Sequence, residues 1–451
     1  MRRDADTATH DFRAAPRAKI APGAGLVLLW APVPLPDVIR LGDAPLILGR
    51  EPPPGGIAIA AAGVSRLHAR IHRAGESWVL TDLDSRNGTL VSGSRVRSIA
   101  LEHGDELRIG DAMFGFVDHD LESYVTSSEP PLFPTLIGGA RVRRLAAELA
   151  AIARADLPVT ILGETGTGKE VVAQAIHAAS GRTGRISAIN CAAIPTHLLE
   201  SELFGYKRGA FSGADRDKVG LVAHAHRGTL FLDEIGDLAP EAQAKLLRLL
   251  ETRELLPLGA LTPEKVDVRV VSATHRDLDA LVAAGKFRGD LFARLSGHVT
   301  RLPALRDRKE DLRLLIPHLL ARHGATHVRA SAAAMGALCH YDWPYNVREL
   351  EAALRRALAL LGTQREIELS HLPETIQRAM EGYGEEASTP SLPPPAREAP
   401  RAQAPDEASM RALLERHRGN VTAIARELRK DRVQVHRWMK RWCLRPEDFR
   451  S

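Results

Sequence analysis

Aromatic residues and cysteines are both scarce in this chain of 451 residues. Phe, Trp and Tyr together make up 4% of the sequence, so the hydrophobic cores are expected to be mainly aliphatic. The three cysteines, Cys191, Cys339 and Cys443, lie far apart and show no Cys-x2-Cys spacing. This distribution argues against a disulfide framework and a zinc site, and it favours a reducing, cytoplasmic setting.

Long hydrophobic runs are absent as well. No apolar stretch approaches the roughly 20 residues of a membrane helix, so no membrane partner is expected. Met1 to Arg17 lacks the hydrophobic centre of a signal peptide. The net charge is only +5, which says little about partners. With 44% hydrophobic and 26% charged residues, the composition is that of a soluble globular protein, and the length suggests about three domains.

The most informative stretch runs from Gly163 to Glu170 and reads GETGTGKE. It follows the apolar run Pro158 to Leu162 and precedes a segment with helical periodicity. Strand, glycine-rich turn and helix form the context in which Gly-x4-Gly-Lys binds nucleotide phosphates, whereas a flexible turn is the alternative. The predicted nucleotide-binding residues are Gly163, Glu164, Thr165, Gly166, Thr167, Gly168, Lys169 and Glu170, the last replacing the usual Ser or Thr.

Two further apolar strands end in polar side chains. Thr229 to Leu232 leads into Asp233 and Glu234, which suit magnesium organisation and polarisation of an attacking water. Val266 to Ser272 leads into Thr274 and His275, whose polar ends could report on a γ-phosphate; an ordinary solvated histidine is the alternative for His275. Alternating strands and helices predict an α/β fold with a parallel sheet.

Other candidates are an aromatic residue in a glycine-rich loop and several arginines. Phe211, within FGYKRGAFSGA, would suit a contact point, although a flexible turn has the same composition. Arg288 and Arg294 could stabilise charge at a nucleotide site, often that of a neighbouring subunit, or form surface salt bridges. Trp343 to Leu350 opens a helical region that places Arg348 near a helix start.

In this order, the motifs resemble the AAA+ activators of sigma-54 RNA polymerase, also called bacterial enhancer-binding proteins. GAFSGA corresponds to the family's GAFTGA loop, and the family also carries Glu after the P-loop lysine. The resemblance implies a sigma-54 contact through Gly209, Ala210, Phe211, Ser212, Gly213 and Ala214. It also implies that Asp233 and Glu234 form the Walker B pair and that Asn190 restrains the catalytic glutamate. Thr274 and His275 would lie at sensor I, and Arg348 would lie at sensor II. Arg288 and Arg294 would be trans-acting fingers in a hexamer. Tyr345 departs from the family's glycine.

The first 118 residues have a different pattern from the segment that contains the glycine-rich loop. Short β-like runs separated by turns predict an all-β sandwich. Leu48-Gly49-Arg50, Val64 to Ala69, Asp82 to Thr89 and Gly104 to Glu106 resemble a forkhead-associated (FHA) domain. The resemblance implies phosphothreonine binding, in which Arg50, Ser65 and Arg66 hold the phosphate and Asn87 holds the peptide backbone. It makes His68 a structural histidine; a sandwich that has lost its ligand is the alternative.

The last 46 residues carry twelve Lys and Arg against seven Asp and Glu, a local net charge of +5. Ala408 to Arg416, Val421 to Arg429 and Arg432 to Trp442 are predicted helices, with Asn420 and Asp431 as N-caps. The segment resembles a Fis-type helix-turn-helix; a basic helix packed on a partner is the alternative. The predicted DNA-contacting residues are Arg432, Gln434, His436, Arg437, Lys440 and Arg441.

These readings define the predicted organisation: a disordered tail (1–23), an FHA domain (24–118), a linker (119–134), an AAA+ domain (135–378, with a small α-helical lid from about 306), a disordered linker (379–405) and an all-α DNA-binding domain (406–451). We expect an ATP- and Mg²⁺-dependent activator that binds upstream DNA, remodels sigma-54 holoenzyme and receives input from a phosphothreonine protein or Ser/Thr kinase. The alternatives are a phosphopeptide-responsive repressor whose AAA+ domain only oligomerises, and a AAA+ remodeller of another protein. The sequence does not identify the target promoters or the kinase, and it does not show whether the FHA domain activates or inhibits.

Overall fold

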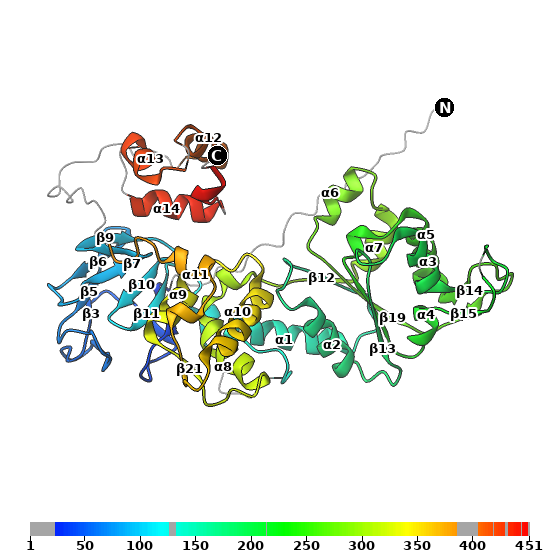
Figure 1. Cartoon of the computed structure of the whole chain (residues 1–451), viewed down its shortest axis with the longest axis horizontal. Coiled ribbons are helices and arrows are strands. Elements are labelled where there is room, and N and C mark those ends of the chain that lie inside the picture. Colours follow the sequence, from blue (N-terminus) through cyan, green and yellow to red (C-terminus); the bar gives the residue numbers. More distant parts are fainter. Residues whose placement is uncertain are drawn as a thin grey trace, which may run out of the picture. The chain divides into compact units, whose positions relative to one another are not determined.

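The computed structural model describes residues 23–125, 132–212, 214–385, 405–417, 419–428, 432–442 and 444–449. It contains an N-terminal β-sandwich, a central α/β unit with a helical lid, and three C-terminal helices (Figure 1). Each part is described by itself. Among the described residues, no helix is long and apolar enough to cross a membrane.

Two sheets form the N-terminal sandwich, as the sequence predicts. One has the strand order β2-β1-β11-β10-β7-β8, and the other has the order β4-β3-β5-β6-β9. Alternating apolar residues such as Leu48, Ile71 and Leu80 point into the core between them. The strands are β1 (Gly25–Trp30), β2 (Val38–Arg40), β3 (Leu46–Gly49), β4 (Ile57–Ala58), β5 (Ala69–Ala74), β6 (Ser77–Asp82), β7 (Thr89–Val91), β8 (Ser94–Val96), β9 (Ser98–Leu101), β10 (Glu106–Ile109) and β11 (Ala112–Val117).

The segment predicted as a linker is structured near both of its ends. The 3-10 helix η1 (Leu121–Tyr124) follows the last strand, and Leu121 is buried against Val27 and Val117 of the sandwich. Phe133 is buried in the core of the central unit. These two apolar side chains therefore extend the folded parts beyond the predicted boundaries; residues 126–131 lie outside the described residues.

The central unit is built on a parallel sheet of order β13-β16-β19-β12-β20 (Figure 1). Helices cover both of its faces: Phe231 of β16 packs with helices α1 and α2, whereas Leu230 and Leu232 pack with α3, α4, α5 and α7. Its elements are α1 (Ala140–Ala153), β12 (Val159–Leu162), α2 (Lys169–Ala179), β13 (Ile186–Asn190), α3 (Thr196–Phe204), β14 (Gly205–Tyr206), β15 (Lys218–Val219), α4 (Leu221–His224), β16 (Thr229–Asp233), η2 (Ile235–Asp237), α5 (Pro240–Thr252), β17 (Glu254–Leu255), β18 (Glu264–Lys265), β19 (Arg269–Thr274), α6 (Leu278–Ala283), α7 (Gly289–Leu295) and β20 (His298–Arg301).

A helical lid follows β20. Its elements are η3 (Leu305–Asp307), η4 (Lys309–Asp311), α8 (Leu312–Arg322), β21 (Arg329–Ala330), α9 (Ala332–His340), α10 (Asn346–Leu361), β22 (Glu366–Ile367), η5 (Leu369–His371) and α11 (Glu374–Ala379). Trp343 is completely buried, and its indole Nε1 donates to the carbonyl oxygen of Leu338 at 2.9 Å. This contact fixes the turn from which α10 begins.

Three helices and a final 3-10 turn form the C-terminal segment: α12 (Glu407–Arg416), α13 (Val421–Leu428), α14 (Arg432–Arg441) and η6 (Pro446–Phe449). The Asn420 side chain accepts from the Ala423 amide at 3.1 Å, as predicted for an N-cap. Trp438 and Met439 lie in the shared core, and Trp442 packs against it. Asp431 and the side chain of Val433, also predicted to act here, lie outside the described residues.

Candidate functional site

The glycine-rich loop of the central unit joins β12 to α2, as predicted. Gly166 and Gly168 have φ angles of +81° and +105°, which L side chains rarely adopt. Lys169 is the first residue of α2 and is buried; its Nζ donates to the carbonyl oxygens of Gly163 at 2.9 Å and Glu164 at 3.2 Å. The loop therefore presents a helix N-terminus and a buried ammonium group together, which is the arrangement that binds phosphates.

Two carboxylates lie beside this lysine. Asp233 ends β16, and Glu234 follows it in a left-handed conformation with φ +52°, which is uncommon outside glycine. Glu234 Oε1 lies 3.7 Å from Lys169 Nζ. Burial and then the charge of Glu234 raise the pKa of Asp233. Burial alone would raise the pKa of Glu234, but the His275 hydrogen bond and the Lys169 charge outweigh it and lower that pKa.

Asn190 does not contact the glutamate that it was expected to restrain. Its Nδ2 donates to Asp233 Oδ2 at 2.9 Å, because β13 and β16 pair with Asn190 opposite Asp233. Glu234 Oε2 instead contacts His275 Nδ1 at 2.8 Å and accepts from Thr274 Oγ1 at 3.3 Å. The restraint of the glutamate by Asn190 stays a prediction, and the predicted residue His275 is a direct partner of Glu234.

The start of α10 packs directly on the glycine-rich loop. The buried Asn346 side chain donates to Glu164 Oε2 at 3.1 Å and to the Thr165 carbonyl oxygen at 3.0 Å. The Val347 amide donates to the Gly166 carbonyl oxygen at 3.0 Å. A Cβ atom on Gly166 would lie 3.0 Å from the Cβ atom of Arg348, so the predicted sensor arginine is beside the loop.

Two lid arginines, absent from the predicted set, also contact the loop. Arg306 makes a two-pronged ion pair with Glu164, and Arg308 Nη2 donates to the Thr167 carbonyl oxygen at 3.0 Å. The Arg306 hydrogen bond lowers the pKa of Glu164 below its ordinary value. No motif marks these arginines, because their partners lie about 140 residues earlier in the sequence.

Tyr345 occupies the position at which the family carries glycine. Its φ angle is −108°, which any residue adopts, and its side chain is exposed. The left-handed residues of this turn are instead Trp343 and Asn346, with φ angles of +53° and +56°. The tyrosine is accommodated because its own backbone needs no glycine.

A pair of buried carboxyl groups lies next to Arg308. Asp311 Oδ1 accepts from the Gly139 amide at 2.6 Å, and Asp311 Oδ2 lies 3.5 Å from Arg308 Nη1. Glu310 is buried beside them, and its Oε1 has no hydrogen-bond partner. Burial, followed by the charge of Asp311, raises the pKa of Glu310 well above its ordinary value.

We expect Glu310→Gln to make the central unit more stable than the wild type at pH 8 and nearly equal to it at pH 5. The pKa of Glu310 is higher in the folded state than its value of 4.5 in the unfolded chain. The protonated carboxyl group therefore contributes fully to the free energy of unfolding below pH 4.5, and this contribution is lost as the pH rises through the folded-state pKa. Each unit of difference is worth about 1.4 kcal/mol. Urea unfolding of the central unit at both pH values measures this; a variant less stable at pH 8 contradicts it.

Of the two predicted arginine fingers, Arg294 lies away from the nucleotide loop of its own chain. Arg294 is exposed and lines a hollow with Asp156 and Pro158, which precede β12, whereas the loop follows the other end of that strand. Arg288 is exposed and forms a two-pronged ion pair with Asp290. Arg294 therefore cannot serve its own loop without rearrangement.

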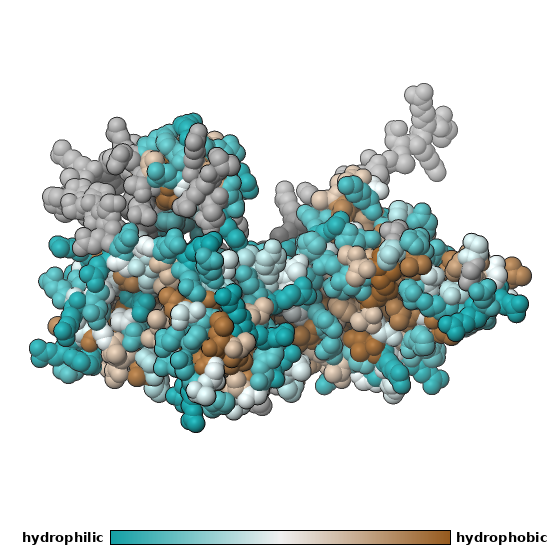
Figure 2. Space-filling model, in the orientation of Figure 1, coloured by the Kyte–Doolittle hydropathy of each residue, from teal (hydrophilic) through white to brown (hydrophobic). Residues whose placement is uncertain are grey.

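The GAFSGA segment is the tip of a hairpin whose base is β14 and β15. Phe211 is 45% exposed, and its ring meets Tyr206 edge-on at 4.9 Å. A second hairpin, β17–β18, packs beside it and carries Leu261, which is 98% exposed. Figure 2 shows hydrophobic atoms at the outer end of this projection. Leu261 was not predicted as part of this surface, and Gly213 lies outside the described residues.

The loops of the sandwich bring together the residues predicted to bind phosphothreonine. The Arg50 amide donates to the Ser65 carbonyl oxygen at 2.8 Å, and Ser65 Oγ accepts from the Arg86 amide at 3.0 Å. Asn87 Nδ2 donates to the Gly63 carbonyl oxygen at 3.0 Å. The guanidinium-bearing side chains of Arg50 and Arg66 are exposed beside this loop pair.

His68 is a structural residue, as expected. It is completely buried, its Nδ1 accepts from the Ser65 amide at 3.1 Å, and its Nε2 contacts the Gly88 carbonyl oxygen at 3.2 Å. Burial lowers the pKa of His68, which favours the neutral ring. The histidine thus joins the two loops that carry Ser65 and Asn87.

All six residues predicted to contact DNA lie on α14. His436, Lys440 and Arg441 have exposed side chains, whereas Val435, Trp438 and Met439 face the core. The side chain of Arg432 lies outside the described residues. The helix is therefore amphipathic, with basic residues opposite its buried face.

Three family models match separate parts of the chain. A model described as the sigma-54 interaction domain matches residues 136–300, and a AAA+ ATPase lid domain matches residues 306–389. An FHA domain model matches residues 46–110. The folds and the order of these domains agree with those predicted from the motifs.

Relatives of known role match over longer stretches. The transcriptional regulatory protein GlrR of Escherichia coli is 38% identical over 350 residues, which cover 76% of this chain and 75% of GlrR. The chain belongs to the sigma-54-dependent transcriptional activators. This activator is also 43% identical to the transcriptional regulatory protein ZraR of Escherichia coli over 292 residues, 64% of each chain.

The activator also resembles a solved structure. NtrX from Brucella abortus in complex with ATP superposes with a TM-score of 0.51 and 29% identity, covering 68% of this chain and 70% of that one. The activator spans just under two thirds of the length of the ZraR proteins that it matches.

Proposed function

We propose that this protein uses ATP hydrolysis in an oligomeric ring to remodel sigma-54 RNA polymerase at promoters. The observation that carries this proposal is the convergence of Lys169, Asp233 and Glu234 in one unit with the exposed Phe211 hairpin. Lys169 would hold the outer phosphates of ATP, and Glu234 would accept a proton from the attacking water. The lowered pKa of Glu234 keeps it anionic and suited to that role.

The oxygen donors at this site fit Mg²⁺ carried on the nucleotide. Asp233 supplies a carboxylate at the end of β16, and hard oxygen ligands are those that Mg²⁺ prefers. Glu170, where most P-loops carry a hydroxyl, is exposed and bonds Gln174, so Asp233 is the residue that would hold the ion. The metal would neutralise charge that develops on the phosphates.

The position of Arg294 supports the proposed ring. Because Arg294 lies at the end of β12 opposite to the nucleotide loop, it would complete the site of an adjacent subunit. Arg288 would act from the same surface once released from Asp290. A ring, most simply a hexamer, brings these side chains to the neighbouring phosphates.

The N-terminal FHA domain would bind a phosphothreonine segment of a partner or of the protein itself. Arg50, Ser65 and Arg66 would hold the phosphate, and Asn87 would hold the peptide backbone. Such binding makes a Ser/Thr kinase the source of the signal. The basic helix α14 would place the activator on upstream DNA, with Arg437, Lys440 and Arg441 among its contacts.

Arg50→Ala is expected to weaken binding of phosphothreonine peptides roughly 10- to 150-fold, because a hydrogen bond to a charged group is worth about 1.5–3 kcal/mol. Fluorescence anisotropy with matched phosphorylated and unphosphorylated peptide libraries measures this. Arg73→Ala is the control, because that exposed arginine bonds the Gly75 carbonyl oxygen on a different hairpin. Equal binding by both variants would remove Arg50 from the site.

Open-complex formation at a sigma-54-dependent promoter tests the central proposal. Opening that requires hydrolysable ATP supports it. If ATP is hydrolysed without opening, deletion of residues 1–118 separates FHA inhibition from a failure to engage sigma-54. The competing repressor function predicts regulation without hydrolysis, and the paired Lys169 and Glu234 argue against it. A AAA+ remodeller of another protein would hydrolyse ATP but would not open this promoter even after the deletion.

A further inference from the structure

A tight turn on the sandwich holds a histidine in a fixed position. His103 lies between β9 and β10, where the buried Asp105 carboxylate accepts from the Glu102 amide at 2.8 Å and from Ser92 Oγ at 3.1 Å. The Gly104 amide then donates to the Phe116 carbonyl oxygen of β11 at 2.8 Å. These bonds set His103 opposite the end of β11.

The residues that face His103 are fixed from both sides. Asp118 and His119 lie between two buried anchors, Val117 of β11 and Leu121 of η1. Asp120, between them, has a φ angle of +56°, so the chain turns sharply there. Asp118 and His119 are exposed and Asp120 is half-buried, and the buried residues on both sides limit the freedom of this backbone relative to His103.

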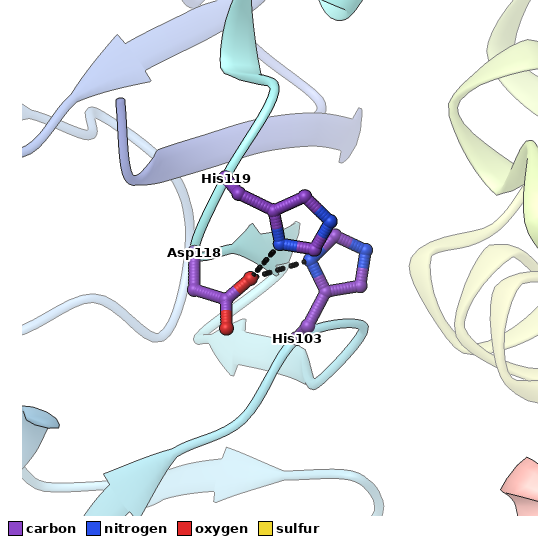
Figure 3. A group of neighbouring side chains, drawn as sticks. All are labelled: His103, Asp118 and His119. Atoms are coloured by element: carbon purple, nitrogen blue, oxygen red, sulfur yellow. Dashed lines mark hydrogen bonds and ion pairs between the residues drawn. The ribbon is translucent and has the colours of Figure 1, made fainter. Parts of the chain in front are cut away.

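The three side chains converge on one point (Figure 3). His103 Nδ1 lies 2.9 Å from Asp118 Oδ1, and His119 Nδ1 contacts the same oxygen. The two rings stack with centroids 4.4 Å apart, and one potential ligand atom from each residue lies within 4.8 Å of the others. Among the described residues, this is the single group of three such side chains.

We propose that His103, Asp118 and His119 bind a divalent transition-metal ion, with Zn²⁺ as the best match. The spacing of the cysteines argued against a zinc site, but this site needs no cysteine: two imidazoles and one carboxylate are typical zinc ligands, and water would complete a four-coordinate shell. Each neutral ring would coordinate the ion through Nδ1 and carry its single proton on Nε2. Mg²⁺ prefers oxygen ligands and would not compete.

A bound ion would have a structural consequence. It would tie the turn after β9 to the segment that leaves β11, where the chain exits the sandwich. This inference is independent of the proposed sigma-54 function, because it rests on the sandwich alone. A metal ion would therefore be a second ligand of the sandwich, in addition to a phosphothreonine segment.

Calorimetric titration of the metal-stripped, nucleotide-free full chain with ZnCl₂ tests the site. We expect micromolar binding that weakens at least about 10-fold in His119→Ala and in His103→Gln. His327→Ala is the control, because that histidine is exposed and outside the cluster. Unchanged binding in both cluster variants, or no zinc binding by the wild type, overturns the proposal.

Co²⁺ provides a second readout, because its visible absorption reports the geometry and the ligands of the bound ion. Its visible absorption should show a tetrahedral species containing nitrogen ligands in the wild type and in His327→Ala, and lose it in His103→Gln. Thermal unfolding without metal checks that the variants fold. An identical Co²⁺ spectrum in His103→Gln, with that variant folded, excludes the site.

Discussion

Glu234→Gln is expected to lower the kcat for ATP hydrolysis roughly 100- to 10,000-fold, the usual contribution of a general base. The carboxylate lies 3.7 Å from Lys169 Nζ and is held by His275 and Thr274, so it is positioned beside the phosphate-binding loop. Glutamine keeps the shape of the side chain but cannot accept the proton of water. Steady-state ATPase assays of the full-length protein measure the loss.

ATP affinity separates this effect from misfolding. Because the proposed phosphate contacts come from Lys169 and the backbone of the loop, the variant should bind ATP with nearly unchanged affinity. Glu241→Gln is the matched control, since Glu241 is an exposed glutamate in the first turn of α5. Hydrolysis by Glu234→Gln at the wild-type rate would exclude Glu234 as the base.

The local parts of the nucleotide site were predictable because a short, contiguous motif encodes them. The glycines of GETGTGKE allow the chain to bend, and the helix starts directly after them, so Gly163 to Lys169 could be recognised from the sequence alone. Arg306 and Asn346 were not predictable, because each reaches Glu164 from more than 140 positions away. Only the folded lid brings such partners together.

Pairing register explains why Asn190 bonds Asp233. β13 ends in Asn190, and β16 ends in Asp233 with Glu234 next, but the sequence does not say which carboxylate the amide meets. The observed register sets Asn190 opposite Asp233, and the left-handed turn at Glu234 directs the next side chain toward His275. His275 was predicted at this site, but its contact with Glu234 could be predicted only by recognising that β19 lies next to β16.

Some strands of the sandwich carry only a weak signal in the sequence. β5, with the sequence ARIHRA, alternates its buried apolar residues with Arg and His, so it lacks the apolar run that marks β1. Its partners β3 and β6 satisfy its backbone on both sides, and packing rather than composition decides its conformation. The residues predicted to bind phosphothreonine were identified from short loop motifs, which do not require every flanking strand to be recognised.

Phe211→Ala is expected to abolish ATP-dependent promoter opening while leaving most ATPase activity intact. The ring is 45% exposed at the tip of a hairpin, and Tyr206 supports it edge-on at 4.9 Å. Its removal deletes a large apolar contact for a partner without creating a cavity in the core. The Lys207 and Asp217 ion pair and the backbone bond from Gly209 to Ala214 should preserve the hairpin.

Val219→Ala is the matched control for that experiment, because Val219 is 60% exposed at the base of the same hairpin. It should retain opening if the tip alone engages sigma-54. Full activity of Phe211→Ala would make Leu261, on the adjacent hairpin, the next candidate for the contact. Loss of both ATPase activity and opening would instead mean that the hairpin supports the nucleotide site. The measurement therefore distinguishes a contact that transmits the work of hydrolysis from one that only stabilises the catalytic unit.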